Sequence, residues 1–248
     1  MACALGALLT AFALQAAAPQ KTTITELKQQ AAAGDINAQI DLGYAYSTGN
    51  GVARNPMESV KWYRIAAERG NPIAQTNLGF AYANAQGVRL DMATAAQWFR
   101  KAAEQGYDSA QANLGALYSA GIGVPRDYKL AEQWLRKSAA QGNRTAQYNL
   151  GVIYTDNRGL PQNFAEGLIW FRKAAERGSV DAQTNLGAMY ASGKGVARDY
   201  LQAYLWLGLA AAAGDAQSAR DRDRVAALMT PAQREQGLKL VRDWKPLP

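Results

Sequence analysis

The side chains that carry most enzyme and metal chemistry are scarce in this sequence of 248 residues. It contains no histidine, and its only cysteine is Cys3. Serine–histidine and cysteine–histidine catalysis, most zinc sites and haem ligation by histidine all need one of these two residue types. We therefore predict no catalytic residue, no metal site and no cofactor, and we expect a protein that is not an enzyme.

Asparagine offers a different kind of chemistry, because it recurs at a fixed spacing of 36 residues. The column consists of Asp41, Asn77, Asn113, Asn149 and Asn185. An amide ladder presents paired donors and acceptors, which would suit the backbone of a bound peptide. The same amides could instead bond neighbouring helices of the fold, as buried polar groups usually do. The sequence leaves both interpretations open.

The same 36-residue period runs through the apolar residues of the chain. Leu-Gly pairs begin at residues 42, 78, 114, 150 and 186, and tryptophan stands at 62, 98, 134, 170 and 206. A fixed period of this length is the mark of a repeat architecture. We predict five units, which span 35–70, 71–106, 107–142, 143–178 and 179–214.

Each unit reads as two helices joined by a turn. In the first helix, Ala38, Leu42, Gly43 and Tyr46 share one face of a 3.6-residue period. A Gly-x-Gly-Val turn follows, and then a column of residues that favour helix N-caps. That column consists of Asn55, Asp91, Asp127, Asn163 and Asp199. The second helix ends at the glycine column of Gly70.

Stacked repeats need atypical ends that shield the apolar surface of the last units. Residues 19–34 predict a polar N-terminal capping helix, because Glu26 stands where a unit would have tryptophan. The period stops after Gly214. Residues 215–248 predict two further helices, 216–229 and 231–241, with Thr230 as the N-cap of the second.

These motifs resemble the Sel-1-like repeat family, the 36-residue relative of the tetratricopeptide repeats. The pattern Ala-Gln-x-Asn-Leu-Gly-x-x-Tyr, Gly-x-Gly-Val-x-x-Asp and Trp-(Phe/Leu)-Arg-Lys-Ala-Ala-x-x-Gly can be followed through all five units. Ala85 and Asn157 replace the first turn glycine in units two and four, so the turns there are expected to differ. The resemblance implies an all-α, right-handed superhelical solenoid of antiparallel helix pairs, with a concave groove that binds proteins or peptides.

The candidate binding residues lie on the first helices, on the side that a helical projection turns away from the core. This side is mostly small and apolar, with three aromatic residues, which suits a peptide. Small residues on a tight inner face are the alternative explanation. The candidates are Ile40, Asp41, Tyr44, Thr76, Asn77, Phe80, Asn84, Asn113, Tyr148, Asn149, Val152, Asp156 and Asn185. Among them, Asp41 and Asp156 stand three units apart, too far for paired-carboxylate catalysis.

The net charge of +7 comes mainly from the second helices, where Arg100 and Lys101 are typical. Glu68, Glu104 and Glu176 follow three of the arginines by four residues, which predicts ion pairs on a solvated surface. Interleaved exposed aromatics are absent, so we predict no nucleic-acid binding. Our leading hypothesis is a scaffold that binds a protein or peptide in the groove. The alternative is a regulator that binds cell-wall glycan through its basic face.

The first residues read as a secretory signal peptide, 1–18, with an apolar stretch between Ala4 and Leu14. This stretch is too short to span a membrane as a helix. We therefore expect a periplasmic or secreted protein without an integral membrane span. The alternative is a buried helix of a cytoplasmic protein. We expect a monomer, although the sequence does not decide whether the chain dimerises.

Overall fold

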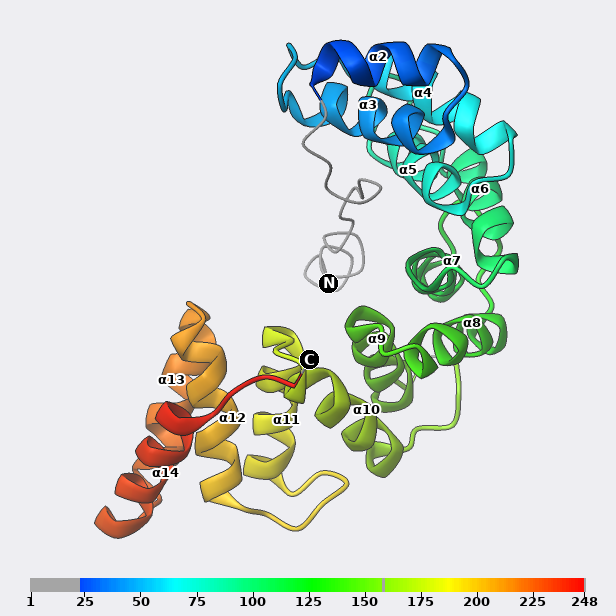
Figure 1. The fold of residues 1–248 in the computed structure, drawn as a ribbon. Helices are drawn as coiled ribbons and strands as arrows, with labels where there is room; N and C mark the ends of the chain where they lie inside the picture. Colours follow the sequence, from blue (N-terminus) through cyan, green and yellow to red (C-terminus); the bar gives the residue numbers. More distant parts are fainter. Residues whose placement is uncertain (1–22, 158, 248) are drawn as a thin grey trace. The chain divides into compact units, whose positions relative to one another are not determined.

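The structure is a computed structural model that describes residues 23–157 and 159–247. Every regular element in these residues is an α-helix, and sequential helices pack against one another in pairs (Figure 1). This arrangement confirms the predicted all-helical solenoid of helix pairs. The chain divides into two compact units, 1–138 and 139–248. The predicted signal peptide, 1–18, lies outside the described residues.

The first compact unit begins with the capping helix and continues with alternating first and second helices. Its helices are α2 (Ile24–Ala32), α3 (Ile36–Thr48), α4 (Pro56–Glu68), α5 (Pro72–Ala83), α6 (Met92–Glu104), α7 (Asp108–Ala120) and α8 (Tyr128–Ala140), within which the division falls. The predicted N-terminal cap contains α2, which starts with a capping box between Thr23 and Glu26.

The second compact unit contains two further repeats and the C-terminal helices. Its helices are α9 (Arg144–Thr155), α10 (Phe164–Glu176), α11 (Val180–Ser192), α12 (Tyr200–Ala212), α13 (Ala216–Ala226) and α14 (Pro231–Asp243). Both α13 and α14 pack against the very apolar α12. In the structure, α13 ends three residues before the predicted 229 and α14 ends two residues after the predicted 241.

The predicted N-cap column is confirmed in all five repeats. Each side chain accepts a hydrogen bond from a backbone N–H in the first turn of the second helix, which would otherwise lack a partner. Such a cap stabilises a helix by about 1 kcal/mol. The oxygens belong to Asn55, Asp91, Asp127, Asn163 and Asp199, and their distances to the donors are 3.2, 2.9, 2.9, 3.0 and 3.0 Å.

The glycine of the Leu-Gly pair lets the two helices of a repeat approach closely. A Cβ atom added to Gly151 would lie 2.5 Å from the ring of Phe171, and one added to Gly43 would lie 2.6 Å from the ring of Tyr63. These distances are shorter than van der Waals contact, so any larger residue would push the second helix away. The repeated glycine is therefore a packing requirement.

A ladder of buried glutamines joins each repeat to the one before it. The amide nitrogen donates to a backbone carbonyl near the end of the preceding second helix, where helices leave carbonyls unpaired. The pairs are Gln39 to Ala31, Gln75 to Ala67, Gln111 to Ala103, Gln147 to Ala139 and Gln183 to Ala175, at 3.1 to 3.4 Å. The Ala-Gln repeat in the sequence therefore encodes a structural link.

The two irregular turns behave differently from each other. Ala85 takes a positive φ of 53°, close to the left-handed conformation that Gly49 and Gly193 adopt after α3 and α11. The turn of unit two is thus largely kept, at the expense of an unfavourable conformation for alanine. Asp156 instead leaves α9 in an extended conformation, with φ −88° and ψ 132°. The expected difference in turn shape is therefore clear after α9.

Candidate partner-binding surface

Six of the predicted groove residues are buried in the fold. Phe80 has 3% of its surface exposed and Asn77 has 1%. The set consists of Ile40, Thr76, Asn77, Phe80, Asn113 and Asn149. The prediction that these side chains face a partner is wrong, because they are buried in the fold.

The aromatic residues of this set take part in the core. The ring of Phe80 packs edge-on against Phe99 of α6, with ring centroids 5.2 Å apart. The ring of Tyr148 lies 5.8 Å from that of Phe171 of α10 and is only half-buried. Burial and the negative charge of Asp181 raise the pKa of Tyr148 to about 12. A hydrogen bond with Asn185 acts in the opposite direction and lowers this pKa in part. Folding therefore explains Phe80 completely and Tyr148 only in part.

The asparagine column is mainly structural. Asn77 lines a small internal cavity together with Ser59 and Tyr63 of α4. Asn113 and Asn149 are also buried, so their amides cannot reach a peptide on the surface. Asn185 is only half-buried and donates a 2.8 Å hydrogen bond to the backbone of Asp181 in its own helix. Burial within the fold, and not contact with a partner, thus explains the middle of the column. Among the described residues, the side-chain nitrogen of Asn149 finds no hydrogen-bond partner.

The helical projection failed because it assumed that a first helix is covered on one side. In α5 the buried residues run without a break from Ala74 to Ala81, and in α7 they run from Ala110 to Tyr118. The helix α5 contacts second helices on both sides, α4 and α6, so little of its circumference stays free. Sequence periodicity alone does not count such neighbours.

The remaining predicted residues keep part of their surface accessible. They are Asp41 and Tyr44 in α3, Asn84 after α5, Tyr148 and Val152 in α9, Asp156 after α9, and Asn185 in α11. Asn84 is exposed, although its side chain donates to the carbonyl of Phe80 at 3.0 Å. Most of the accessible candidates therefore lie in the second compact unit.

The face that carries them continues onto α13, which sequence analysis missed. Ser218 stands 36 residues after Ala182 and is fully buried. Its hydroxyl oxygen lies 2.8 Å from the hydroxyl oxygen of Thr184 in α11. The helix α13 thus stands where the first helix of a sixth repeat would stand. Counting on by 36 residues from Thr184 and Asn185 leads to Arg220 and Asp221. The signal was present in the spacing, although the consensus residues are lost after Gly214.

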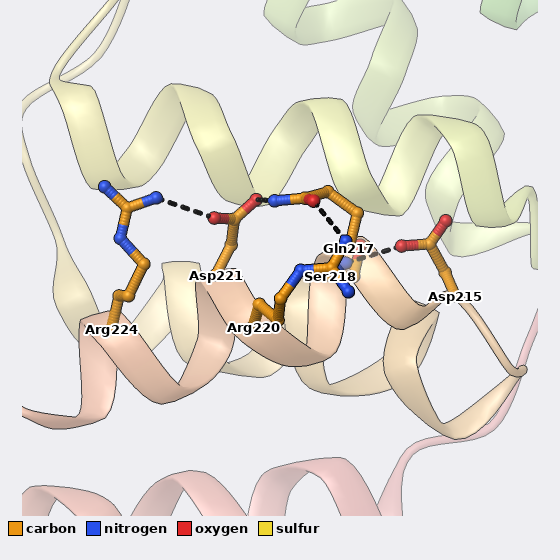
Figure 2. Close-up of polar contacts among 6 residues, drawn as sticks. All are labelled: Asp215, Gln217, Ser218, Arg220, Asp221 and Arg224. Carbon is orange, nitrogen blue, oxygen red and sulfur yellow. Dashed lines mark hydrogen bonds and ion pairs between the residues drawn. The ribbon is translucent and has the colours of Figure 1, made fainter.

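Figure 2 shows a row of polar side chains along α13. Arg224 donates to Asp221 at 3.1 Å, and Gln217 donates to the other carboxylate oxygen of Asp221 at 2.9 Å. Arg220 in turn donates to the side-chain oxygen of Gln217 at 2.5 Å. The side chain of Arg224 remains 82% exposed. The row holds two guanidinium groups in place without burying them.

We call this surface the α9–α11–α13 face. It offers the ring of Tyr148, the small side chain of Val152, the exposed Ala188 and the charged row of α13. Aromatic, apolar and arginine side chains together are typical of surfaces that bind proteins. The described residues contain no group of three or more His, Cys, Asp or Glu side chains that would hold a metal ion.

The basic residues of the second helices have structural contacts that the sequence did not predict. Arg64 donates to the hydroxyl of Tyr82 at 3.0 Å, and Arg100 donates to that of Tyr118 at 2.6 Å. Arg172 donates in the same way to Tyr190. These arginines link one repeat to the next, and their hydrogen bonds go to tyrosines in place of the glutamates that the i,i+4 spacing suggested.

The lysines of the same helices lie over the tryptophan rings. The amino group of Lys101 is 4.1 Å from the ring centre of Trp98, that of Lys137 is 4.2 Å from Trp134, and that of Lys173 is 4.4 Å from Trp170. Such cation–π contacts stabilise a surface by about 0.5–1 kcal/mol each. The basic columns therefore have a role in the fold itself.

Comparison with known proteins identifies the repeat. The family model of the Sel1 repeat matches residues 36–71, 72–107, 108–143, 144–179 and 180–215, one residue after the units predicted above. The chain belongs to the Sel1 repeat family. Sel1 repeats commonly form scaffolds for protein interactions, and the fold is generally non-catalytic. The comparison with curated proteins gave no match.

Two solved structures share 34% sequence identity with this Sel1 repeat chain. One is a protective antigen present in uropathogenic Escherichia coli strains, with an SLR fold and a TM-score of 0.79; the match covers 89% of this chain and 48% of that one. The other is a Sel1 repeat protein from Oxalobacter formigenes, with a TM-score of 0.73 and coverage of 81% and 58%. The chain thus spans about half the length of these relatives.

A third structure is an immunity protein from Pseudomonas aeruginosa, with 20% identity and a TM-score of 0.53. The match covers 86% of this Sel1 repeat chain and 82% of the immunity protein. Because the sequence identity is low, the match shows the fold alone. In the part of the chain that the structure describes, no helix combines the length and the apolar character that a membrane crossing requires.

Proposed function

We propose that this Sel1 repeat protein is a scaffold that binds a protein or peptide partner on the α9–α11–α13 face. The observation that carries the proposal is the row of Arg220, Asp221 and Arg224 on α13, which continues the first-helix columns. An end cap needs only polar side chains for solubility. The hydrogen bonds along α13 that orient both guanidinium groups exceed that requirement.

The chemistry of the face suits a protein ligand. Arginine and tyrosine dominate the binding energy of many protein interfaces, because they combine a large contact area with hydrogen bonding. Arg224 presents donors to a carboxylate or a backbone carbonyl, while Tyr148 and Val152 provide apolar contact. A scaffold role also agrees with the common use of the repeat in protein interactions.

We further propose that the protein acts in the periplasm or outside the cell. The support for this location is the apolar, uncharged stretch at the start of the sequence. The glycan-binding alternative stays a prediction, because the arginines and lysines of the second helices are engaged with tyrosine and tryptophan.

The test is site-specific photocrosslinking in cells of the source organism. A photoreactive residue at Ala188, which is exposed on α11, should crosslink to a defined partner protein. The matched control is Ile169, which is 47% exposed on the second helix α10. The proposal predicts a discrete adduct from position 188 and none of the same mass from position 169. Equal adducts from both positions, or none from 188, would reject the α9–α11–α13 face.

A further inference from the structure

The chain folds back on itself after α14. Trp244 takes an extended conformation, with φ −68° and ψ 142°, and residues 244–247 run from α14 back toward α10 and α11 (Figure 1). Lys245 precedes Pro246, and a residue before proline favours extended backbone. The proline itself fixes φ near −65°. The segment is therefore shaped as an extended peptide before it makes any contact. We call residues 244–247 the tail.

Three contacts hold the tail on the second compact unit. Trp244 is half-buried and packs against the core cluster that α10, α11, α12 and α13 share. Pro246 lies over the turn between α10 and α11, where its Cβ is 3.7 Å from the position that a Cβ on Gly178 would take. The backbone N–H of Leu247 donates to the carbonyl of Glu176 at 2.7 Å.

The surface beneath the tail offers one backbone acceptor, the carbonyl of Glu176, that an extended peptide can use. Glu176 is the last residue of α10, and the last carbonyls of a helix have no partner within it. At three of the corresponding turns, a Cβ added to Gly70, Gly106 or Gly214 would meet no atom within 4 Å. At the other two, Gly34 and Gly142, an arginine side chain lies within 4 Å. The cover at Gly178 comes partly from the tail.

Some groups of the tail contact the fold, and others face solvent. Lys245 and Pro246 are exposed residues, and the side chain of Leu247 also faces solvent, with 54% of that residue exposed. Specificity then rests on the tryptophan, on the rigid proline and on a backbone donor one residue after the proline. A peptide that carries Trp-x-Pro-x has all three groups.

We propose that the end of α10 and the α10–α11 turn form a docking site for extended peptides of the Trp-x-Pro-x type, which the tail occupies in cis. The site is separate from the α9–α11–α13 face, because its bonds come from the end of a second helix and its turn. A tethered segment acts at an effective concentration on the order of millimolar. It therefore masks the site from a weak free peptide, whose apparent affinity falls with the fraction of sites left open.

The probe is a fluorescent peptide of the sequence Arg-Asp-Trp-Lys-Pro-Leu-Pro, measured by anisotropy against the full chain. Trp244→Ala should release the tail, so the peptide should bind this variant at least tenfold more tightly than the unchanged chain. Lys245→Ala is the matched control, because Lys245 is exposed, and it should behave like the unchanged chain. Equal affinity for all three chains, or no saturable binding to Trp244→Ala, would overturn the proposal.

Three further experiments distinguish the possible outcomes. If Trp244→Ala loses its helical circular dichroism, Pro246→Asp is the second variant. It should weaken the contacts of residues 246–247 with the α10–α11 turn, and a smaller gain in peptide affinity is expected. A photoreactive leucine in the peptide should crosslink to residues 176–179, and a crosslink elsewhere contradicts the assigned site. Arg220→Glu with Arg224→Glu should not change peptide affinity, which separates this site from the α9–α11–α13 face.

Discussion

The first helices of the two compact units use the same sequence columns for different purposes. In α5 and α7 the columns are buried on nearly every side, and Phe80 is part of the core. In α9 and α11 the same columns leave Tyr148, Val152 and Asn185 partly accessible, and α13 extends them with arginine. A repeat position thus has no fixed role, because its exposure depends on the helices that cover it.

The largest expected effect comes from truncating the buried aromatic residue of this comparison. Phe80→Ala removes a ring that packs on Phe99 and should lower the free energy of unfolding by about 3–5 kcal/mol. Tyr148→Ala, at a half-buried position, should cost clearly less. Chemical denaturation of both variants checks this order. Equal losses would mean that the two regions do not differ in burial as described.

The next largest effect is expected from a charge placed in the asparagine column, which should destabilise the fold more at a buried position than at an accessible one. Asn113→Asp buries a carboxylate without a cationic partner and should cost about 3 kcal/mol at neutral pH. Burial raises the pKa of that carboxyl above its unfolded value, so the loss should shrink as pH falls toward 4. Asn185→Asp, on the accessible side, is the control and should cost less than about 1 kcal/mol. Melting curves at pH 4 and pH 7 provide the measurement.

The titration of Tyr148 should report its partial burial directly. Its pKa is raised to about 12, mainly by burial and then by Asp181, while an unfolded tyrosine titrates near 10. The contribution of the neutral Tyr148 phenol to the free energy of unfolding is therefore complete below pH 10. It is lost as the pH rises from 10 toward 12. The phenolate difference spectrum between the unchanged chain and Tyr148→Phe should have its midpoint near 12. A midpoint near 10 would show that the ring is fully solvated.

The smallest effect concerns the turns after the first helices. Ala85 has a φ of 53°, whereas the corresponding turns after α7 and α11 have glycine at Gly121 and Gly193. Ala85→Gly should therefore stabilise the fold by about 1 kcal/mol. Ala83→Gly, two residues earlier at the last residue of α5, should destabilise it by less than about 1 kcal/mol. Thermal melting of both variants tests whether the two changes have opposite signs.

Local rules of the sequence predicted most of the fold. The N-caps such as Asp199, the close glycines such as Gly151 and the five repeats all follow from residue type and spacing. The accessible face did not follow, because exposure depends on helices that are distant in sequence. Arg220 and Arg224 were missed since the consensus residues end at Gly214 while the spacing continues. The tail contact between Leu247 and Glu176 has no periodic signal at all.

The central claim is that a partner binds the α9–α11–α13 face through the arginines of α13. The most direct measurement is the affinity of the crosslinked partner for the purified chain with Arg220→Glu and Arg224→Glu, beside the control Arg234→Glu on exposed α14. The account predicts at least a tenfold loss of affinity for the double variant, unchanged melting, and no loss for the control. Unchanged affinity of the double variant, or an equal loss in the control, would contradict it.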